Sequence, residues 1–374
     1  MPGLYIHIPF CLRACCYCDF HFKARLDRKD EMVSAMSHEI ETRLTGAASV
    51  FDTLYIGGGT PTVLSPDNWE MLMETCRAHA VWKGEFTVEA NPEDLTPAYL
   101  QMLKDLGVNR LSIGIQSFDD DVLQWMHRRH SARCAMDAVA DAQTCGFDNL
   151  NIDLMYGIPG MSLSMWERQL QEAVRLRPAH LSAYHLTIEP QTIFGVQQRK
   201  GLLAPVDEQD SLAQYQLLAK YMKDAGYQHY EISNFSLPGC EAVHNSAYWK
   251  QQPYAGFGPS AHSFTGSTRR WNVASNNRYM HGVMAGTDDW FEEEQLSERD
   301  RYNEFVMLSL RTAWGVRTDR LESIFPKKYL AFFRQGIQKY LDGGQMIPCG
   351  PDAFRIAEPA WMIADSIISD LFMV

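Results

Sequence analysis

Four cysteines fall within eight positions near the N-terminus, in the stretch PFCLRACCYCDF (9–20). Cys11, Cys15 and Cys18 form the spacing C-x3-C-x2-C directly after a short apolar run that predicts a strand. Thiolates ligate iron–sulfur clusters, and a cubane cluster takes four ligands. Three cysteines leave one iron with an open position, as a catalytic zinc keeps one position free for an exogenous ligand. We therefore interpret the triplet as the ligands of a [4Fe-4S] cluster with a free site.

Other interpretations of these cysteines stay open. A structural zinc would need a second pair of ligands, and no second pair is evident; reactive thiols are a further alternative. Cys16 could supply a fourth thiolate, but neighbouring side chains in an extended loop point apart, so it is a poor ligand beside Cys15. The chain has 9 cysteines, an odd number, and the crowding of four of them argues against a disulfide scaffold.

A glycine run and several polar residues follow later predicted strands. GGGTP (57–61) comes directly after the second one, and glycines let a ligand approach the backbone closely. A tight turn explains the same run, and no Gly-Lys-Ser/Thr follows, so it is not a Walker loop. Four polar residues lie at or just past the ends of later strands: Glu89, Gln116, Asp153 and Tyr184. A helix cap or salt bridge explains each one alone. Together they predict one polar rim that suits an organic cofactor beside the cluster.

The segment HNSAYW (244–249) combines a histidine, an asparagine and two aromatic residues. A neutral imidazole can ligate haem iron and aromatic rings can line a porphyrin-sized slot, so His244 is a candidate haem ligand. His262, in GPSAHSF, is a second candidate on the same segment. From the residues alone, packing of this segment against its neighbours is the simpler explanation. No C-x-x-C-H motif indicates covalent haem attachment.

Short runs rich in Val, Ile, Leu and Tyr alternate with segments of helical periodicity over the first 233 residues. Six strands are predicted at 4–8, 52–56, 85–90, 110–116, 149–157 and 180–186, with a possible seventh at 228–233. Glycine follows three of the intervening helices just before the next strand, which is a usual stop signal. The alternation predicts an α/β fold with a parallel sheet, open or rolled into a barrel, whose strand ends share one face.

The pattern changes after residue 235. Residues 236–294 are rich in aromatic residues, Gly and Ser without a clear period, so we expect an ordered, irregular segment with a possible functional role. From 295 onward the chain predicts three helices, a hairpin and a closing helix, an order that resembles a winged helix. We therefore expect three parts, at 1–235, 236–294 and 295–374.

The composition sets broad limits. The chain has 374 residues, 46% of them hydrophobic, which is typical of a globular protein with more than one domain. Its formal net charge of −12 argues against general affinity for nucleic acid or anionic membranes. The N-terminus MPGLYIHIPF lacks the regions of a secretory signal, and no run of apolar residues is long enough for a membrane span. We expect a cytoplasmic location.

Six motifs, taken in order, resemble those of a known family: YIHIPFCxxxCxYC, GGGTP, VEANPE, GIQSFD, NIDLMYGIPG and HLSAYHLTIEP. The chain is similar to radical S-adenosylmethionine (SAM) proteins, in particular to oxygen-independent coproporphyrinogen III oxidase and its relatives. HNSAYW resembles the HNxxYW signature of the HemW-type haem chaperone branch. The oxidases carry an N-terminal extension and usually a further cysteine after the triplet, whereas Asp19 and Phe20 follow Cys18 here. The resemblance implies a partial (β/α)6 barrel followed by a winged-helix-like C-terminal domain.

The resemblance also implies a role for each matching residue. Cys11, Cys15 and Cys18 would ligate the [4Fe-4S] cluster, with the amine and carboxylate of SAM on its open iron. Tyr5 and Tyr17 would flank the cluster and SAM. Gly58, Gly59 and Thr60 would meet the methionyl end of SAM, and Glu89, Gln116, Arg128 and Asp153 would hold its charged groups and ribose. Arg128 would otherwise be an exposed helical charge. His244 would be a candidate haem ligand. Cys16 stands where relatives commonly have proline, and we expect no change of function from it.

Three functions are compatible with these features. The first is a haem chaperone that passes haem to apo-haemoproteins, with membrane-bound respiratory proteins and a peripheral position at the inner membrane as open options. The second is oxidative decarboxylation of coproporphyrinogen III by a 5′-deoxyadenosyl radical. HNSAYW favours the chaperone, and the lack of the extension and of the extra cysteine counts against the oxidase. A plain iron–sulfur electron carrier would leave GGGTP and the polar rim unexplained.

Overall fold

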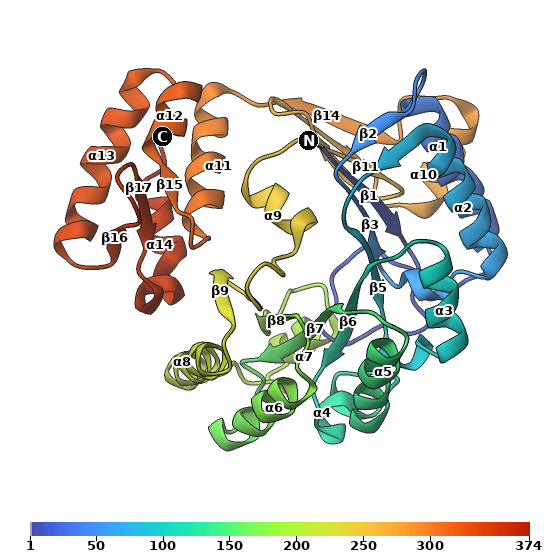
Figure 1. Cartoon of the computed structure of the whole chain (residues 1–374), viewed down its shortest axis with the longest axis horizontal. Helices are drawn as coiled ribbons and strands as arrows, with labels where there is room; N and C mark the ends of the chain where they lie inside the picture. Colours follow the sequence, from blue (N-terminus) through green and yellow to red (C-terminus); the bar gives the residue numbers. More distant parts are fainter. Residues whose placement is uncertain (1) are drawn as a thin grey trace.

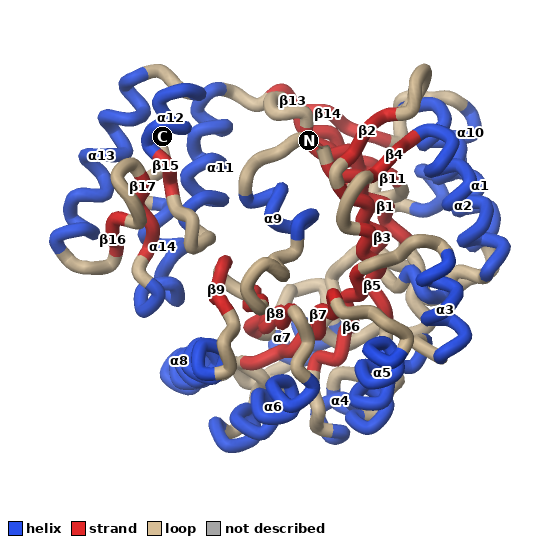
Figure 2. The backbone as a smooth tube through the Cα atoms, viewed as in Figure 1, coloured by secondary structure: helices blue, strands red, loops and turns tan. Residues whose placement is uncertain are grey.

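The computed structural model describes residues 2–374, which form a larger part built on a curved sheet and a smaller, mostly helical part at its side (Figure 1). In the larger part the strands form an arc, and most helices lie on its outer side (Figure 2). The smaller part begins at α11 (Glu298–Leu310) and runs to the C-terminus. This arrangement leaves the inner side of the arc free of large helices.

Six parallel strands form the centre of a 12-stranded sheet, in the order β1-β3-β5-β6-β7-β8. They are β1 (Gly3–Ile8), β3 (Thr53–Gly58), β5 (Phe86–Ala90), β6 (Arg110–Gln116), β7 (Asn149–Tyr156) and β8 (His180–His185). All six predicted strands are therefore present, and the predicted α/β fold with a parallel sheet is confirmed. Within residues 2–374 the two ends of the sheet do not pair, so the barrel is partial.

Alternation along each strand gives the sheet two different faces. Leu4, Ile6 and Ile8 of β1 are fully buried, as are Val88 of β5 and Ile152 of β7. This apolar side lies under the outer helices, so its burial is the main favourable term for the fold. The helices are α1 (Lys29–Arg43), α2 (Pro66–His79), α3 (Pro97–Asp105), α4 (Asp120–Trp125), α5 (Ala132–Thr144), α6 (Leu163–Leu176), α7 (Ile193–Arg199) and α8 (Glu208–Asp224). The residues in between point to the inner face, which is therefore the face with polar side chains.

Polar residues begin most of these helices. Ser65, Thr96, Asp119, Ser131 and Ser162 each accept a hydrogen bond from a backbone N–H in the first turn of the helix that follows. Such caps satisfy N–H groups that have no partner inside the helix. Two short 3-10 helices follow the carboxyl ends of β3 and β5: η1 (Pro61–Val63) and η2 (Pro92–Asp94). A separate 2-stranded sheet joins β2 (Ser49–Phe51) and β4 (Ala80–Trp82).

The segment expected to be irregular contains regular elements. They are α9 (Val243–Trp249), β11 (Tyr254–Phe257), β12 (His262–Phe264), β13 (Thr268–Asn272), α10 (Asn276–Ala285) and β14 (Phe291–Gln295). β11 pairs in parallel with β1, and β12, β13 and β14 continue the sheet in antiparallel order. At the other end β10 (Asn234–Ser236) pairs with β8, and β9 (Gln228–Glu231) pairs with β10. The pairing partner of β11 lies about 250 residues away in the sequence, so no local pattern reveals it.

The C-terminal part has the predicted order of elements. After α11 come β15 (Val316–Arg317), α12 (Thr318–Ile324), α13 (Lys327–Asp342), β16 (Met346–Pro348), β17 (Ala353–Ile356), η3 (Glu358–Ile363) and α14 (Ala364–Ser369). A 3-stranded sheet of order β15-β17-β16 packs with these helices. The exact boundaries of the three parts of the chain stay a prediction.

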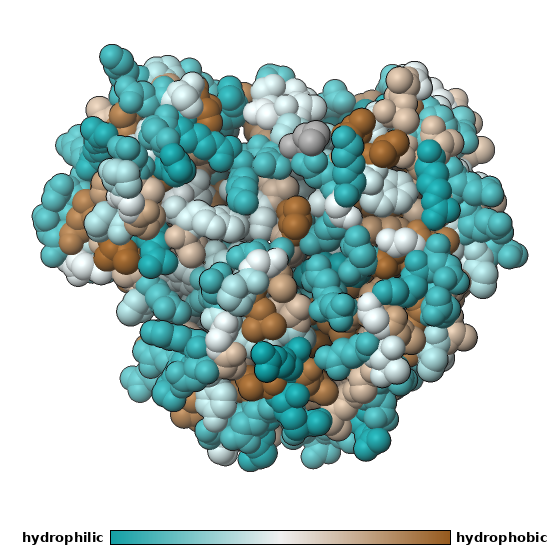
Figure 3. All heavy atoms as spheres, in the orientation of Figure 1, coloured by the Kyte–Doolittle hydropathy of each residue, from teal (hydrophilic) through white to brown (hydrophobic). Residues whose placement is uncertain are grey.

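The outer surface is consistent with this packing. The face in Figure 3 is largely hydrophilic, and hydrophobic residues are scattered over it. None of the helices within residues 2–374 combines the length and hydropathy that crossing a bilayer requires.

Candidate functional site

The three cysteines of the triplet line one cavity of about 380 Å³ on the inner face of the sheet, which we call the cysteine cavity. The other predicted residues that line it are Tyr17, Gly58, Gly59, Thr60, Glu89, Gln116, Arg128, Asp153 and Tyr184. The structure therefore brings almost the whole predicted set together. Tyr5 and His244 do not line this cavity.

The loop after β1 separates the thiol of Cys16 from the other three. The backbone N–H of Cys16 donates to the Met126 carbonyl at 3.1 Å, and the Cys16 carbonyl accepts from the Phe194 N–H at 3.0 Å. The side chain packs against the hydrophobic core and does not line the cysteine cavity. Of the four cysteines in the stretch, Cys16 is thus the one turned away, as expected from its position beside Cys15.

Two polar side chains approach the thiols inside the cavity. Thr60 Oγ1 donates to Cys11 Sγ at 3.4 Å, and Arg128 Nη1 donates to Cys15 Sγ at 3.5 Å. Burial raises the pKa of the Cys11 thiol to about 11 and that of Cys18 to about 12. Because a metal ligand must be a thiolate, binding of a cluster here has to displace protons from these sulfurs.

The donor set fits an iron–sulfur cluster better than a single ion. Within residues 2–374 no three His, Cys, Asp or Glu side chains converge closely enough to hold one metal ion. In a cubane cluster each thiolate binds a different iron, so the thiols need only face a common space. Cys11, Cys15 and Cys18 meet that condition.

The glycine run forms part of the cavity wall because side chains would not fit there. A Cβ at Gly58 would lie 2.7 Å from Nδ1 of His7, and a Cβ at Gly59 would lie 2.5 Å from the Phe10 carbonyl oxygen. Gly58 also has a φ of 109°, which favours glycine. The backbone of this run therefore packs closely against its neighbours, and Gly58 and Gly59 line the cysteine cavity.

Glu89 lies on the inner face of β5 and is held by two donors. Tyr55 donates from its hydroxyl to Oε1 at 2.7 Å, and the Gly58 N–H donates to Oε2 at 3.0 Å. Burial raises the pKa of Glu89 to about 7, although the hydrogen bond from Tyr55 acts in the opposite direction. Near neutral pH this carboxyl group can therefore both accept and donate a hydrogen bond.

Arg128 brings a buried positive charge to the opposite wall. Its Nη2 donates to Asn91 Oδ1 at 2.8 Å and to the Gly114 carbonyl at 2.5 Å. Its Nε is buried and has no hydrogen-bond partner within residues 2–374. Buried donors normally find a partner, and the guanidinium that carries this one lines the cysteine cavity. Gln116 lies beside it in an irregular part of β6, with a φ of 68°.

Asp153 completes the polar lining from β7. Its Oδ1 accepts from Asn151 Nδ2 at 2.8 Å, and burial raises its pKa. Asn151 in turn contacts Nδ1 of His180 through Oδ1 at 2.6 Å. The cavity thus holds carboxyl groups, a guanidinium and hydroxyl groups around one space, which fits a zwitterionic ligand such as SAM beside a cluster.

A second, larger cavity of about 600 Å³ adjoins the first, and we call it the aromatic cavity. Its lining includes Tyr5, His7, Phe20, His21, Tyr248, Tyr254, Ser260, His262, Phe264, Arg269, Glu304 and Leu308. Asp19, Phe20, Gly58 and Glu89 line both cavities. A ligand in the aromatic cavity would therefore share a wall with a ligand in the cysteine cavity.

His244 lies behind this second cavity. It is 1% exposed, its Nδ1 is 2.7 Å from Thr53 Oγ1, and its Nε2 is 2.7 Å from the Tyr248 hydroxyl. Burial lowers the pKa of this imidazole to about 3, so it is neutral. Its role as a haem ligand stays a prediction, and ligation would require it to give up one of these hydrogen bonds. Tyr248, in the same motif, is the residue that faces the aromatic cavity.

Sequence reasoning missed several lining residues. Asn91 connects the two walls of the cysteine cavity, because its Nδ2 donates to Thr60 Oγ1 at 3.2 Å and its Oδ1 accepts from Arg128. Its position two residues after Glu89, in VEANPE, could have indicated this. Tyr254, Phe264 and the other residues of β11 to β13 carry no such local signal, because their place depends on long-range pairing.

Comparisons with known proteins agree with this arrangement. Residues 5–173 match the radical SAM superfamily, and residues 296–346 match the HemN C-terminal domain. The chain is 36% identical to "Heme chaperone HemW" of Bacillus subtilis over 336 residues, which cover 88% of this chain and 87% of that protein. It is 34% identical to "Radical S-adenosyl methionine domain-containing protein 1, mitochondrial" of Bos taurus, over 87% of this chain and 76% of that protein.

A solved structure has the same fold over the whole chain. The coproporphyrinogen III oxidase HemN of Escherichia coli superposes with a TM-score of 0.85, covering 100% of this chain and 90% of that chain. At 23% sequence identity this likeness shows the shared fold alone.

Proposed function

The chain belongs to the HemW haem chaperone family of radical SAM proteins, and on that premise we propose that it binds haem and delivers it to apo-haemoproteins. The observation that supports haem binding most directly is the aromatic cavity, which has about 600 Å³, rings on several sides and histidines in its wall. A porphyrin needs a mostly apolar, concave site with a few polar groups that fix its orientation. The relatives named haem chaperones favour this function over the oxidase.

The same proposal includes two resident cofactors. Cys11, Cys15 and Cys18 would ligate a [4Fe-4S] cluster, and SAM would lie next to it in the cysteine cavity. When bound, the cluster would supply one-electron chemistry next to SAM. Thr60 donates a hydrogen bond to Cys11 Sγ and would therefore lie beside the cluster.

The protein groups around SAM have complementary charges. The guanidinium of Arg128 lines the cavity and would bind the carboxylate of SAM; within residues 2–374 its buried Nε has no hydrogen-bond partner. Glu89 and Asp153 would bind its amine and ribose hydroxyls, and Gly58 and Gly59 would let its methionyl chain approach the backbone. Tyr17 lines the same cavity and would flank SAM, whereas Tyr5 would flank it from the wall of the aromatic cavity. Gln116, beside Arg128, would complete the ribose contacts.

Delivery of haem also requires recipients. The proposed location is the cytoplasm, at the periphery of the inner membrane. The proposed recipients are membrane-bound respiratory apoproteins. A carrier for such recipients has to release haem at their surface, so its cavity must open to the outside.

A transfer experiment tests this function. The anaerobically reconstituted protein, loaded with one haem and freed of excess, is mixed with an apo-haemoprotein that has a distinct Soret band. We expect the recipient's band to appear at the expense of the donor's. Failure to transfer, together with anaerobic conversion of coproporphyrinogen III to protoporphyrinogen IX, would support the oxidase instead.

A further inference from the structure

The histidines in the wall of the aromatic cavity differ in what their ring nitrogens already hold. His7 Nδ1 is 3.0 Å from the Tyr5 hydroxyl, and its Nε2 is 2.9 Å from the His21 carbonyl oxygen. His21 Nε2 is 2.6 Å from Asn276 Oδ1. Within residues 2–374 the His262 ring makes no hydrogen bond; it stacks near Trp271 with centroids 6.2 Å apart. His262 is therefore the cavity histidine whose ring nitrogens are both available.

The alternation of β12 aims this ring into the cavity. Ser263 points the opposite way, because its hydroxyl contacts Arg43 Nη2 at 3.0 Å and accepts from the Gly256 N–H at 2.9 Å. His262 and Phe264 lie on either side of Ser263 in the strand, so their side chains share the other face. Both line the aromatic cavity, and the His262 side chain is exposed there.

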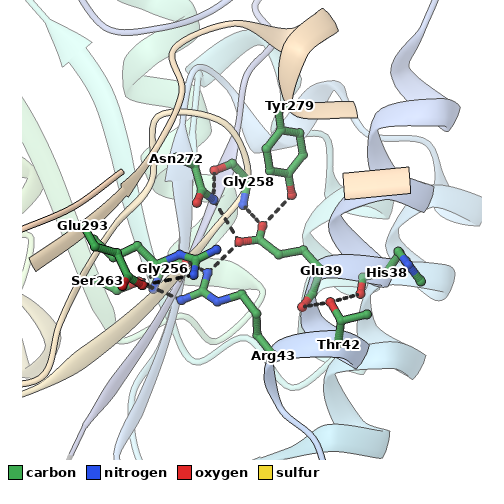
Figure 4. Close-up of polar contacts among 11 residues, drawn as sticks. His38, Glu39, Thr42, Arg43, Gly256, Gly258, Ser263, Asn272, Tyr279 and Glu293 are labelled. Carbon is green, nitrogen blue, oxygen red and sulfur yellow. Dashed lines mark hydrogen bonds and ion pairs between the residues drawn. The ribbon is translucent and has the colours of Figure 1, made fainter. Parts of the chain in front are cut away.

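A buried carboxylate contacts the segments that flank β12 (Figure 4). Glu39 of α1 is fully buried and accepts from the Gly258 N–H at 2.8 Å, from Asn272 Nδ2 at 2.9 Å and from the Tyr279 hydroxyl at 2.5 Å. Arg43, one turn further along α1, pairs with Glu39 at 2.5 Å. These contacts join the helix to the strands on either side of β12.

Arg43 fixes the strand itself. Its Nη1 donates to the Gly256 carbonyl at 2.7 Å, and its Nη2 donates to Ser263 (Figure 4). The backbones of β11 and β12 also come very close here, since a Cβ at Gly256 would lie 2.0 Å from the His262 carbonyl oxygen. The backbone at His262 is therefore held in place before any ligand arrives, which favours an effective metal ligand.

From this geometry we propose that His262 is the axial ligand of the haem iron in the aromatic cavity. The inference rests on the proposed function and names the residue that holds the iron. A free imidazole nitrogen in an aromatic cavity is the donor that haem iron takes in many haem proteins. His244 is then a positioning residue, because its Nε2 holds the hydroxyl of Tyr248, which lines the same cavity.

The test compares ferric haem with iron-free protoporphyrin IX in the cluster-loaded wild type, His262→Ala and His262→Gly. A lost iron ligand weakens ferric haem binding at least tenfold and leaves protoporphyrin binding within twofold. Imidazole added to His262→Gly should restore the wild-type Soret maximum and electron paramagnetic resonance (EPR) signal of the haem. His281→Ala, on the exposed side of α10, is the matched control. Cluster content and Tm should stay unchanged in all variants, because His262 makes no hydrogen bond that folding requires.

The outcomes separate the ligand from the function. If His262→Ala keeps the wild-type haem affinity, Soret maximum and EPR signal, then His262 is not the ligand and the haem chaperone function stands. If the wild type binds neither haem nor protoporphyrin, the proposed function itself fails.

Discussion

The backbone N–H of Gly58 donates to Glu89 Oε2 at 3.0 Å, and these two residues lie in the walls of both cavities. A β3 turn and a β5 side chain thus form a shared partition between the space beside the cysteines and the space among the aromatic rings. The two predicted ligands, SAM and haem, would therefore lie next to each other.

Substitution at the partition should disturb both cavities. Gly58→Ala places a Cβ 2.7 Å from His7 at a φ of 109°, so the turn must move. We expect a loss of about 1–3 kcal/mol in the free energy of unfolding and weaker binding of both SAM and haem. Gly46→Ala is the matched control, because Gly46 has a φ of 92° with no atom within 4 Å of its Cβ. Equal effects of the two substitutions would contradict a role for Gly58 beyond backbone strain.

Three of the four cysteines in the N-terminal stretch should be required for the cluster, and one should not. Cys11→Ala, Cys15→Ala and Cys18→Ala should each lose most of the iron and acid-labile sulfide after anaerobic reconstitution. Cys16→Ala should keep the full amount, because its side chain packs against the core and away from the cysteine cavity. The EPR spectrum of the reduced cluster gives an independent reading. A full cluster in Cys11→Ala would show that the ligand assignment is wrong.

Much of this site could be predicted from the sequence because it is built from local patterns. Glu89, Gln116 and Asp153 follow from strand runs whose order alone puts them on one sheet. Glu89 lies next to the end of β5, as predicted, whereas Asp153 lies inside β7; both point to the inner face, where alternation along the strand decides the direction of a side chain.

The aromatic cavity could not be predicted in the same way. Its far wall comes from β11 to β13, which reach the sheet through pairing of β11 with β1. His244 illustrates the limit at one residue. Its motif made it a candidate haem ligand, and the structure shows that α9 turns the ring toward Thr53 and buries it. Local residue types do not encode which side of a short helix meets the sheet.

The acid group of Glu89 should make the cofactor-free protein less stable as the pH rises. Its pKa is about 7 when folded and about 4.5 when unfolded, so the folded state holds the extra proton between these values. The contribution of this group to the free energy of unfolding is fully present below about pH 4.5. It is lost as the pH rises through 7, a change of about 3 kcal/mol. Glu231 has a similar pKa, so the difference between wild type and Glu89→Gln is the quantity to measure, by urea unfolding from pH 5 to 8. A constant difference across this range would contradict the prediction.

His244 should matter for stability. In His244→Ala a buried ring is lost and the hydroxyls of Thr53 and Tyr248 lose a partner. We expect the free energy of unfolding to fall by about 2–4 kcal/mol. The exposed variant His281→Ala should change it by no more than about 0.5 kcal/mol. A wild-type Tm in His244→Ala, combined with loss of the Soret band, would instead support the prediction of His244 as the haem ligand.

The central claim is that haem binds in the aromatic cavity, and one titration tests it most directly. Ferric haem is titrated anaerobically into the cluster-loaded wild type and into Leu308→Trp, in which the larger side chain fills the cavity from α11. We predict saturation at one haem per chain in the wild type and at least a tenfold loss of affinity in the variant. Saturable binding of equal affinity in both proteins would place haem elsewhere, and absorbance that rises without saturation in the wild type would contradict the account.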